Sequence, residues 1–138
     1  MLIGISPLLG PDLLHALRAM GHGDEIAFVD GNYPAADHAR RLIRADGIPL
    51  LPMLEAVLAV LPVEQAFRAA LNNDPAQAGD IHRQIDAVVQ GSGMATTPLA
   101  GDALYPRIRS AYAVVATSEP ALFANVILRK AALSPSQT

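Results

Sequence analysis

The amino-acid sequence predicts a single α/β domain over residues 1–138, with a central sheet flanked by helices. Several segments carry apolar residues at helical spacing, and polar turns separate them. The run Ile26-Ala27-Phe28-Val29 is apolar without alternation, which is typical of a central strand buried on both faces. A chain of 138 residues that is 51% hydrophobic and 17% charged is long enough to bury one core.

The first helix and the first strand have clear sequence signals. Residues 11–20 predict a helix, because Pro11 suits the first helical position and the apolar residues that follow fall on one face. Gly21 ends that helix. Residues 24–29 predict the central strand, and residues 30–34 predict a turn at its carboxyl end.

The middle of the chain carries weaker signals. Residues 40–44 fit a strand or a helix end, closed by Asp46 and Gly47. Residues 49–61 have a helical pattern that tolerates Pro52 in its first turn. Residues 65–71 fit either a strand or a helical continuation.

The remainder alternates helices and strands. Residues 77–89 predict a helix ended by Gly91-Ser92-Gly93, and residues 94–101 predict a turn-rich surface loop. We expect a further helix over 102–112, interrupted near Pro106. Residues 113–117 and 125–128 predict two strands joined by a short loop.

Composition excludes several classes of function. The chain has no cysteine, which removes thiolate nucleophiles and cysteine zinc sites and suits a cytoplasmic protein. A net charge of −3 with scattered Lys and Arg gives no basic stripe for nucleic acid. We expect no signal peptide, because the first residues lack a basic region, and no membrane span. The abundance of small aliphatic residues favours a homo-oligomer that hides apolar surface.

His22 is the leading candidate for catalysis. It stands between Gly21 and Gly23, just past the predicted first helix, where an imidazole can act as a general acid or base near neutral pH. The alternative is a histidine on a solvated loop that only interacts with the helix dipole.

Asp30 is the second candidate, at the far end of the predicted central strand. Its carboxylate can bind sugar hydroxyls or orient a base, since ligands collect at the carboxyl ends of strands in open α/β sheets. The alternative is an Asx-turn over Gly31 and Asn32. Eight residues separate Asp30 from His22, a span of about 26 Å if extended, so one ligand reaches both only if the chain folds back or if two subunits share a site.

Other polar residues carry weaker signals. Arg44 and Asp46 fit an ion pair, and Arg107 beside Tyr105 can reach a hydroxyl or cover apolar surface with its stem. We interpret His15, His38 and His82 as solvated helix or loop residues. His82 and Asp86 share a helical face, but two groups without a third are a weak case for a metal site, and we expect none.

The chain resembles the bacterial L-fucose mutarotase and D-ribose pyranase family over nearly its whole length. The resemblance is carried by short runs at both ends, and the middle from Pro62 to Pro98 matches loosely. The runs are Ile5-Ser6-Pro7-Leu8-Leu9, Met20-Gly21-His22-Gly23-Asp24-Glu25, Asp30-Gly31-Asn32-Tyr33-Pro34, Ile43-Arg44-Ala45-Asp46-Gly47, Thr117-Ser118-Glu119 and Asn125-Val126-Ile127-Leu128-Arg129-Lys130.

The resemblance implies a D-ribose pyranase-like α/β fold, no metal or organic cofactor, and conversion between cyclic forms of a free sugar. It implies that His22 is the proton donor and that Asp30 and Arg107 contact the substrate. The family's sugar-binding triplet Tyr-Gly-Asn aligns with Phe123-Ala124-Asn125, so the phenolic hydroxyl is lost and Ala124 restricts the backbone. It also implies a ring-like homo-oligomer, such as a decamer, with pockets at subunit contacts.

Within that family, the Ile43-Arg44-Ala45-Asp46-Gly47 run and Arg107 favour an L-fucose mutarotase. We expect His22 to assist opening and reclosure of the sugar ring, while Asp30, Arg107 and Asn125 hold its hydroxyls and Phe123 packs on its apolar face. The alternatives are a D-ribose pyranase, a non-catalytic sugar-binding protein, and an oligomeric structural protein without sugar affinity.

Overall fold

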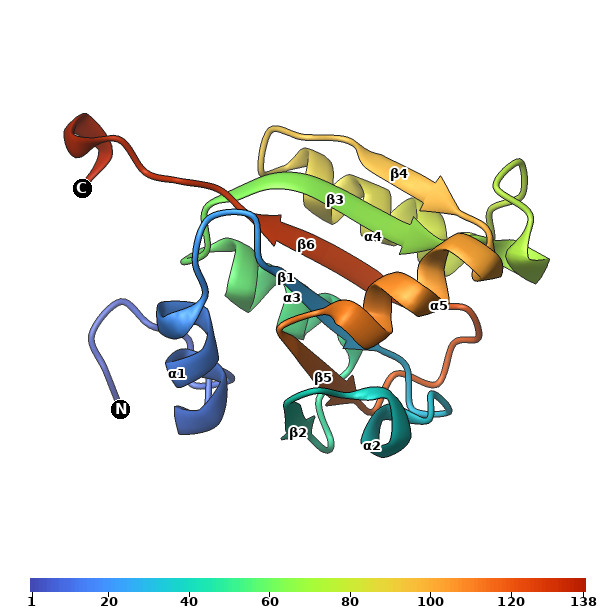
Figure 1. Cartoon of the computed structure of the whole chain (residues 1–138), viewed down its shortest axis with the longest axis horizontal. Helices are drawn as coiled ribbons and strands as arrows, with labels where there is room; N and C mark the ends of the chain where they lie inside the picture. Colours follow the sequence, from blue (N-terminus) through green and yellow to red (C-terminus); the bar gives the residue numbers. More distant parts are fainter.

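The computed structural model describes residues 1–138 and has three layers, with helices on both faces of one mixed sheet (Figure 1). In Figure 1, α5 crosses in front of the sheet, whereas α3 and α4 lie behind it. The helices are α1 (Pro11–Ala19), α2 (Ala35–His38), α3 (Leu50–Leu58), α4 (Asp80–Gln90) and α5 (Gly101–Ser110), with short 3₁₀ turns η1 (Leu71–Asn73) and η2 (Pro135–Gln137).

Six strands form the sheet in the order β2-β5-β1-β6-β3-β4. They are β1 (Glu25–Val29), β2 (Leu42–Ala45), β3 (Val63–Ala69), β4 (Thr96–Leu99), β5 (Ala113–Thr117) and β6 (Val126–Lys130). β1 runs parallel to β5 and antiparallel to β6, which also pairs antiparallel with β3. β1 and β6 therefore form the centre of the sheet, and their ends define where a ligand can be held.

Side chains of β1 alternate between two cores. Ile26 and Phe28 point to a cluster with α1, α3 and α4, while Ala27 and Val29 point to a smaller cluster with α5. All four side chains are fully buried. The continuous apolar run is thus explained by burial on both faces, and the predicted central strand is confirmed.

Most predicted elements are confirmed, with shifted ends. The helix from Pro11, the helix with Pro52 in its first turn and the two late strands are present. Residues 40–44 and 65–71, for which the sequence allowed either a strand or a helix, overlap the strands β2 and β3. The two late strands are not neighbours in the sheet, because β1 lies between them.

Two sequence predictions were wrong. The segment expected as a surface loop contains β4, in which Pro98 pairs opposite Arg68 at the edge of the sheet. An edge strand tolerates a proline because one side of its backbone needs no partner, and four residues are too few to show alternation. The helix expected to break near Pro106 continues through it as α5.

Beyond the last strand, the chain leaves the sheet as a tail that extends away from the rest of the molecule (Figure 1). Large apolar side chains at both ends of the chain are exposed, among them Ile3 and Leu133. None of the helices combines the length and the apolar character that a membrane span requires.

Candidate functional site

The carboxyl end of β1 holds Asp30 in a network of backbone groups. Its Oδ1 accepts the N–H of Asn32 at 2.9 Å, and its Oδ2 accepts the N–H of Ala124 at 3.3 Å. The first bond is the Asx-turn considered from sequence, and the second links the turn to the loop before β6. The carboxylate is thus fixed in place, with 6% of the residue exposed.

Burial raises the pKa of Asp30 above its ordinary value, although backbone N–H groups of Asn32, Ala124 and Tyr33 oppose that change. Glu119 adds a smaller contribution in the same direction as burial. A raised pKa makes a carboxylate a stronger base than an exposed aspartate. The carboxylate of Asp30 can therefore accept a proton or a hydrogen bond from a ligand hydroxyl.

Asn125 directly precedes β6, and its side chain reaches Asp30. Its Oδ1 accepts the backbone N–H of Asp30 at 3.0 Å, and its Nδ2 amide hydrogens take no part in that bond. Because an amide nitrogen donates two hydrogen bonds, Nδ2 can hold oxygen atoms of a ligand. Asp30 and Asn125 therefore present an acceptor and a donor at neighbouring positions.

Phe123 adopts a left-handed backbone conformation with φ of 57°. For a residue with a side chain this conformation costs about 1–2 kcal/mol, so contacts must hold it. The carbonyl oxygen of Phe123 accepts a hydrogen bond from Nε2 of His82 at 2.9 Å. Ala124 lies outside the left-handed region and is fully buried, so the alanine in the triplet fits its backbone without strain.

Asp30, Phe123 and Asn125 line a cavity of about 370 Å³ at the carboxyl end of β1. Its walls combine the polar groups of Asp30, Asn32 and Asn125 with the rings of Tyr33, Tyr105 and Phe123 and with Pro34, His38 and Leu122. The volume falls within the range of about 300–1,000 Å³ usual for small-molecule sites. Polar groups facing an apolar wall suit a sugar, whose ring carries hydroxyls on its edge and C–H groups on its faces.

The structure places two histidines differently from the sequence interpretation. His82 is fully buried rather than solvated: its Nδ1 accepts the N–H of Gly79 at the start of α4, and its Nε2 donates to Phe123. His38 is also largely covered, with its Nδ1 2.8 Å from the hydroxyl oxygen of Tyr33. Each ring nitrogen of both histidines has a hydrogen-bond partner: backbone groups for His82 and the side chains of Tyr33 and Arg109 for His38. Spacing along the chain does not reveal these partners.

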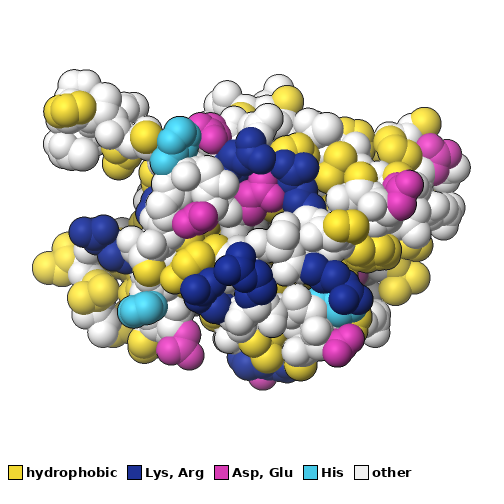
Figure 2. All heavy atoms as spheres, viewed as in Figure 1, with side chains coloured by type: hydrophobic (Ala, Val, Ile, Leu, Met, Phe, Trp, Pro, Cys, Tyr) yellow, Lys and Arg dark blue, Asp and Glu magenta, His cyan; other side chains and the backbone are white.

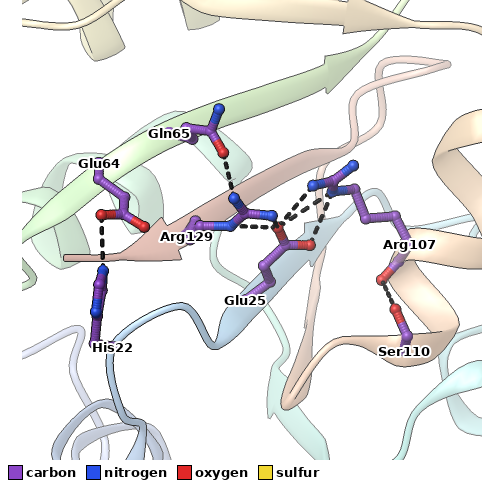
Figure 3. Close-up of polar contacts among 7 residues, drawn as sticks. All are labelled: His22, Glu25, Glu64, Gln65, Arg107, Ser110 and Arg129. Carbon is purple, nitrogen blue, oxygen red and sulfur yellow. Dashed lines mark hydrogen bonds and ion pairs between the residues drawn. The ribbon is translucent and has the colours of Figure 1, made fainter.

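The amino end of β1 holds a second group of charged residues (Figure 3). Nε2 of His22 lies 3.0 Å from Oε2 of Glu64, and the imidazole is 60% exposed. Glu25 binds Nε of Arg107 at 2.9 Å and Nη2 of Arg129 at 3.0 Å. Figure 2 shows basic and acidic side chains in the middle of the viewed face. Glu25, Arg107 and Arg129 line a hollow there.

The predicted site residues therefore fall into two sets. Asp30, Phe123, Ala124 and Asn125 meet at the carboxyl end of β1. His22 and Arg107 lie near its amino end. The five residues of β1 separate the two ends by about 17 Å. Within one copy of the chain, a monosaccharide in the cavity beside Asp30 does not reach His22.

His82 and Asp86, which share a face of α4, are engaged elsewhere. Asp86 binds the buried guanidinium of Arg68 at 2.6 Å, and it also accepts the hydroxyl of Thr96. Burial alone raises the pKa of Asp86, but the hydrogen bonds from Arg68 and Thr96 outweigh it, so the pKa lies below the usual value. Groups of three or more potential metal ligands are absent from the structure.

Sequence reasoning did not assign six of the residues that line the cavity, among them three with rings that can contact a ligand: Tyr33, His38 and Tyr105. Tyr33 follows Asp30 by three residues, so the turn predicted over residues 30–34 was a signal that could have placed it beside Asp30. Tyr105 and His38 arrive from α5 and α2, and only the packing of those helices brings them to the end of β1.

Comparisons with known proteins agree on one family. Residues 3–133 match the RbsD / FucU transport protein family. The L-fucose mutarotase of Glaesserella parasuis serovar 5 (strain SH0165) is 39% identical over 140 residues, which cover 94% of both chains. The crystal structure of the fucose mutarotase in complex with L-fucose from Streptococcus pneumoniae has a TM-score of 0.88 and 34% identity, covering 96% of this chain and 100% of that one. Bacillus subtilis RbsD complexed with D-ribose has a TM-score of 0.76 at 23% identity, covering 97% of this chain and 100% of that one, and shows the shared fold.

Proposed function

Because the chain belongs to the RbsD / FucU transport protein family, we propose that it is a mutarotase that interconverts the anomers of L-fucose. It is an isomerase of a free sugar, acting by opening and reclosure of the ring. The observation that best supports this function is the cavity at the carboxyl end of β1, in which Asp30 and Asn125 face aromatic rings. Relatives named for fucose, at the identities given above, favour this sugar.

The chemistry of a hemiacetal defines what the site must do. Ring opening requires a proton on the ring oxygen and removal of the proton from the anomeric hydroxyl. The aldehyde then rotates and the ring recloses on its other face, so that the anomeric hydroxyl changes orientation and no atom is gained or lost. Two groups that exchange protons near neutral pH, on opposite sides of the sugar, suffice for this step.

Asp30 is well placed to be one of these groups. Its buried carboxylate can accept the anomeric proton or hold a neighbouring hydroxyl, and Nδ2 of Asn125 can donate to a second oxygen. The ring of Phe123 supplies an apolar wall for the sugar's C–H face. Ala124 contributes its backbone, whose N–H orients Asp30.

His22 is the second group in this proposal, and it must come from a neighbouring copy of the chain. The length of β1 keeps His22 away from its own cavity, while its exposure leaves it available to another subunit. Leu122, which lines the cavity, is 64% exposed, as expected of a residue that a neighbouring copy covers. We therefore propose a closed homo-oligomer, such as a decameric ring, in a cytoplasmic location.

In this proposal Arg107 acts together with His22, because both lie near the amino end of β1. Glu25 occupies Nε and Nη2 of Arg107, and Nη1 has no partner in the protein. That nitrogen can donate to a sugar hydroxyl in the adjacent subunit's cavity.

Saturation-transfer NMR of equilibrated L-fucose and of D-ribose, with and without the protein, tests the function. The exchange is read at the anomeric protons. Faster exchange between the fucose anomers is the expected result. Faster exchange between the ribose pyranose and furanose forms, without an effect on fucose, would instead select a D-ribose pyranase. A folded protein that binds sugar and accelerates neither exchange would be a binding protein.

A further inference from the structure

Three side chains form a hydrogen-bonded chain that ends at the cavity. Tyr33 lines the cavity, and its hydroxyl oxygen lies 2.8 Å from Nδ1 of His38. Nε2 of the same imidazole lies 2.8 Å from Nη2 of Arg109, in the last turn of α5. The mutarotase chemistry described above does not use any of the three.

The direction of the hydrogen bonds follows from Arg109. A guanidinium has only donors, so Nε2 of His38 must accept and carry no hydrogen. The hydrogen of the neutral imidazole then stands on Nδ1, which donates it to the oxygen of Tyr33. Asp37 does not reverse this order, because its carboxylate is 3.8 Å from Nε2 and is mostly exposed.

The hydroxyl hydrogen of Tyr33 is consequently left for the cavity. Its oxygen receives the hydrogen bond from His38, and no other group of the protein accepts the hydroxyl hydrogen. Burial, with smaller contributions from Tyr105 and Asp30, raises the pKa of Tyr33 to about 12, against the opposing charge of Arg109. The phenol therefore keeps its proton throughout the neutral range and acts as a donor.

The ring of Tyr33 is held on two sides. It meets His38 edge to face, with ring centroids 5.2 Å apart, and it lies 6.1 Å from the ring of Tyr105. Such packing limits the rotation of the ring, so the hydroxyl keeps its position relative to Asp30 and Asn125. Phe123, on the loop before β6, lines the same cavity without a hydroxyl of its own.

We propose that Tyr33 is a substrate-binding residue that donates its hydroxyl hydrogen to one sugar oxygen, and that His38 and Arg109 are positioning residues that fix the direction of this donor. The inference rests on the proposed function, since it requires a monosaccharide in the cavity. It adds a specificity determinant: the sugar must carry an oxygen opposite Tyr33. An analogue without that oxygen leaves a buried donor unpaired.

Tyr33→Phe tests the donor, because it removes one oxygen atom and keeps the ring. We expect the KM for fucose anomer exchange to rise about tenfold with a smaller change in kcat, as for a hydrogen bond made before and during the reaction. Thr97→Val is the control, since it removes one exposed hydroxyl from the edge strand β4, outside the cavity and the charged group at the amino end of β1. That control should leave KM unchanged.

Substitutions at His38 separate positioning from a structural role. His38→Leu should raise KM nearly as much as Tyr33→Phe, and the double variant should be no worse than Tyr33→Phe alone, because His38 acts through the same hydroxyl. His38→Asn, whose amide N–H can replace that of Nδ1, should retain most of the affinity. Additive losses in the double variant would contradict the positioning role.

Monodeoxy derivatives of L-fucose identify the contacted oxygen. For one derivative, we expect the unsubstituted protein to lose about tenfold in kcat/KM relative to L-fucose and Tyr33→Phe to show no such loss. Equal losses in both proteins for every derivative would overturn the inference while leaving the mutarotase activity intact. If the unsubstituted protein accelerates no exchange, the proposed function fails, and calorimetric binding of the same sugars to both proteins then decides on Tyr33.

Discussion

His82 and Phe123 are joined by a hydrogen bond of 2.9 Å, from Nε2 of the fully buried imidazole to the carbonyl oxygen of the residue with the left-handed backbone. The bond connects α4 with the loop that forms one wall of the cavity. A residue inside the domain thereby holds a strained residue at the binding site.

Replacement of His82 should weaken both the fold and the site. His82→Leu leaves the carbonyl of Phe123 and the N–H of Gly79 without partners, so we expect a loss of about 2 kcal/mol in the free energy of unfolding. Denaturant unfolding measures the loss. The KM for fucose should rise as the Phe123 loop relaxes, and an unchanged KM would show that the loop is held by other contacts.

Stability should also fall on acidification because of His82. Burial lowers the pKa of its imidazole, against a hydrogen bond to Phe123 that opposes the change. In the unfolded chain this imidazole takes up a proton near pH 6.5, whereas in the folded chain it does not. The contribution of His82 to the free energy of unfolding is therefore complete above that pH and decreases below it. Unfolding curves between pH 7.5 and 5 should show this decrease, and His82→Gln should reduce it. An equal decrease in both proteins would assign it to other groups.

The ion pair of Arg68 and Asp86 should contribute to stability far more than exposed pairs. Asp86→Asn leaves the buried guanidinium of Arg68 without its carboxylate, and we expect a loss of about 2–3 kcal/mol. Asp80→Asn is the matched control on the same helix, because its pair with Arg83 is exposed and should contribute less than about 0.5 kcal/mol. Thermal unfolding gives the melting temperatures of the two variants. Similar melting temperatures would contradict a larger contribution from the pair of Arg68 and Asp86.

Sequence reasoning placed His22 and Asp30 on either side of β1 and indicated their separation, but not the partners that surround the cavity. The glycines around His22 and the turn after Asp30 are local signals, and both residues stand where the sequence placed them relative to β1. Phe123, a partner of His82, is 41 residues away, and Arg109, a partner of His38, is 71 residues away. The periodicity of a single segment does not encode such contacts. For the same reason β4 was missed: a four-residue edge strand with a proline depends on its pairing with β3.

His22 should be essential for catalysis and dispensable for folding. His22→Ala removes an exposed imidazole that pairs with Glu64, so the free energy of unfolding should change little. The catalysed exchange of fucose anomers should fall by a factor of about 100 or more. His15→Ala, at another exposed position, is the control and should keep full activity. Retention of activity by His22→Ala would remove this residue from the mechanism.

Asp30→Asn should also abolish most of the exchange, because the amide cannot take up a proton from the anomeric hydroxyl. Its side chain can still accept the N–H of Asn32, so circular dichroism should show an intact fold. Full activity in this variant would limit Asp30 to the Asx-turn.

The shared site is tested most directly by mixing two inactive proteins, His22→Ala and Asp30→Asn, in one assembly. If each cavity combines Asp30 of one copy with His22 of the next, an equal random mixture has both residues in about a quarter of its sites. The mixed assembly should therefore recover about a quarter of the unsubstituted rate of fucose exchange. A mixed assembly as inactive as its two components would contradict a site shared between subunits.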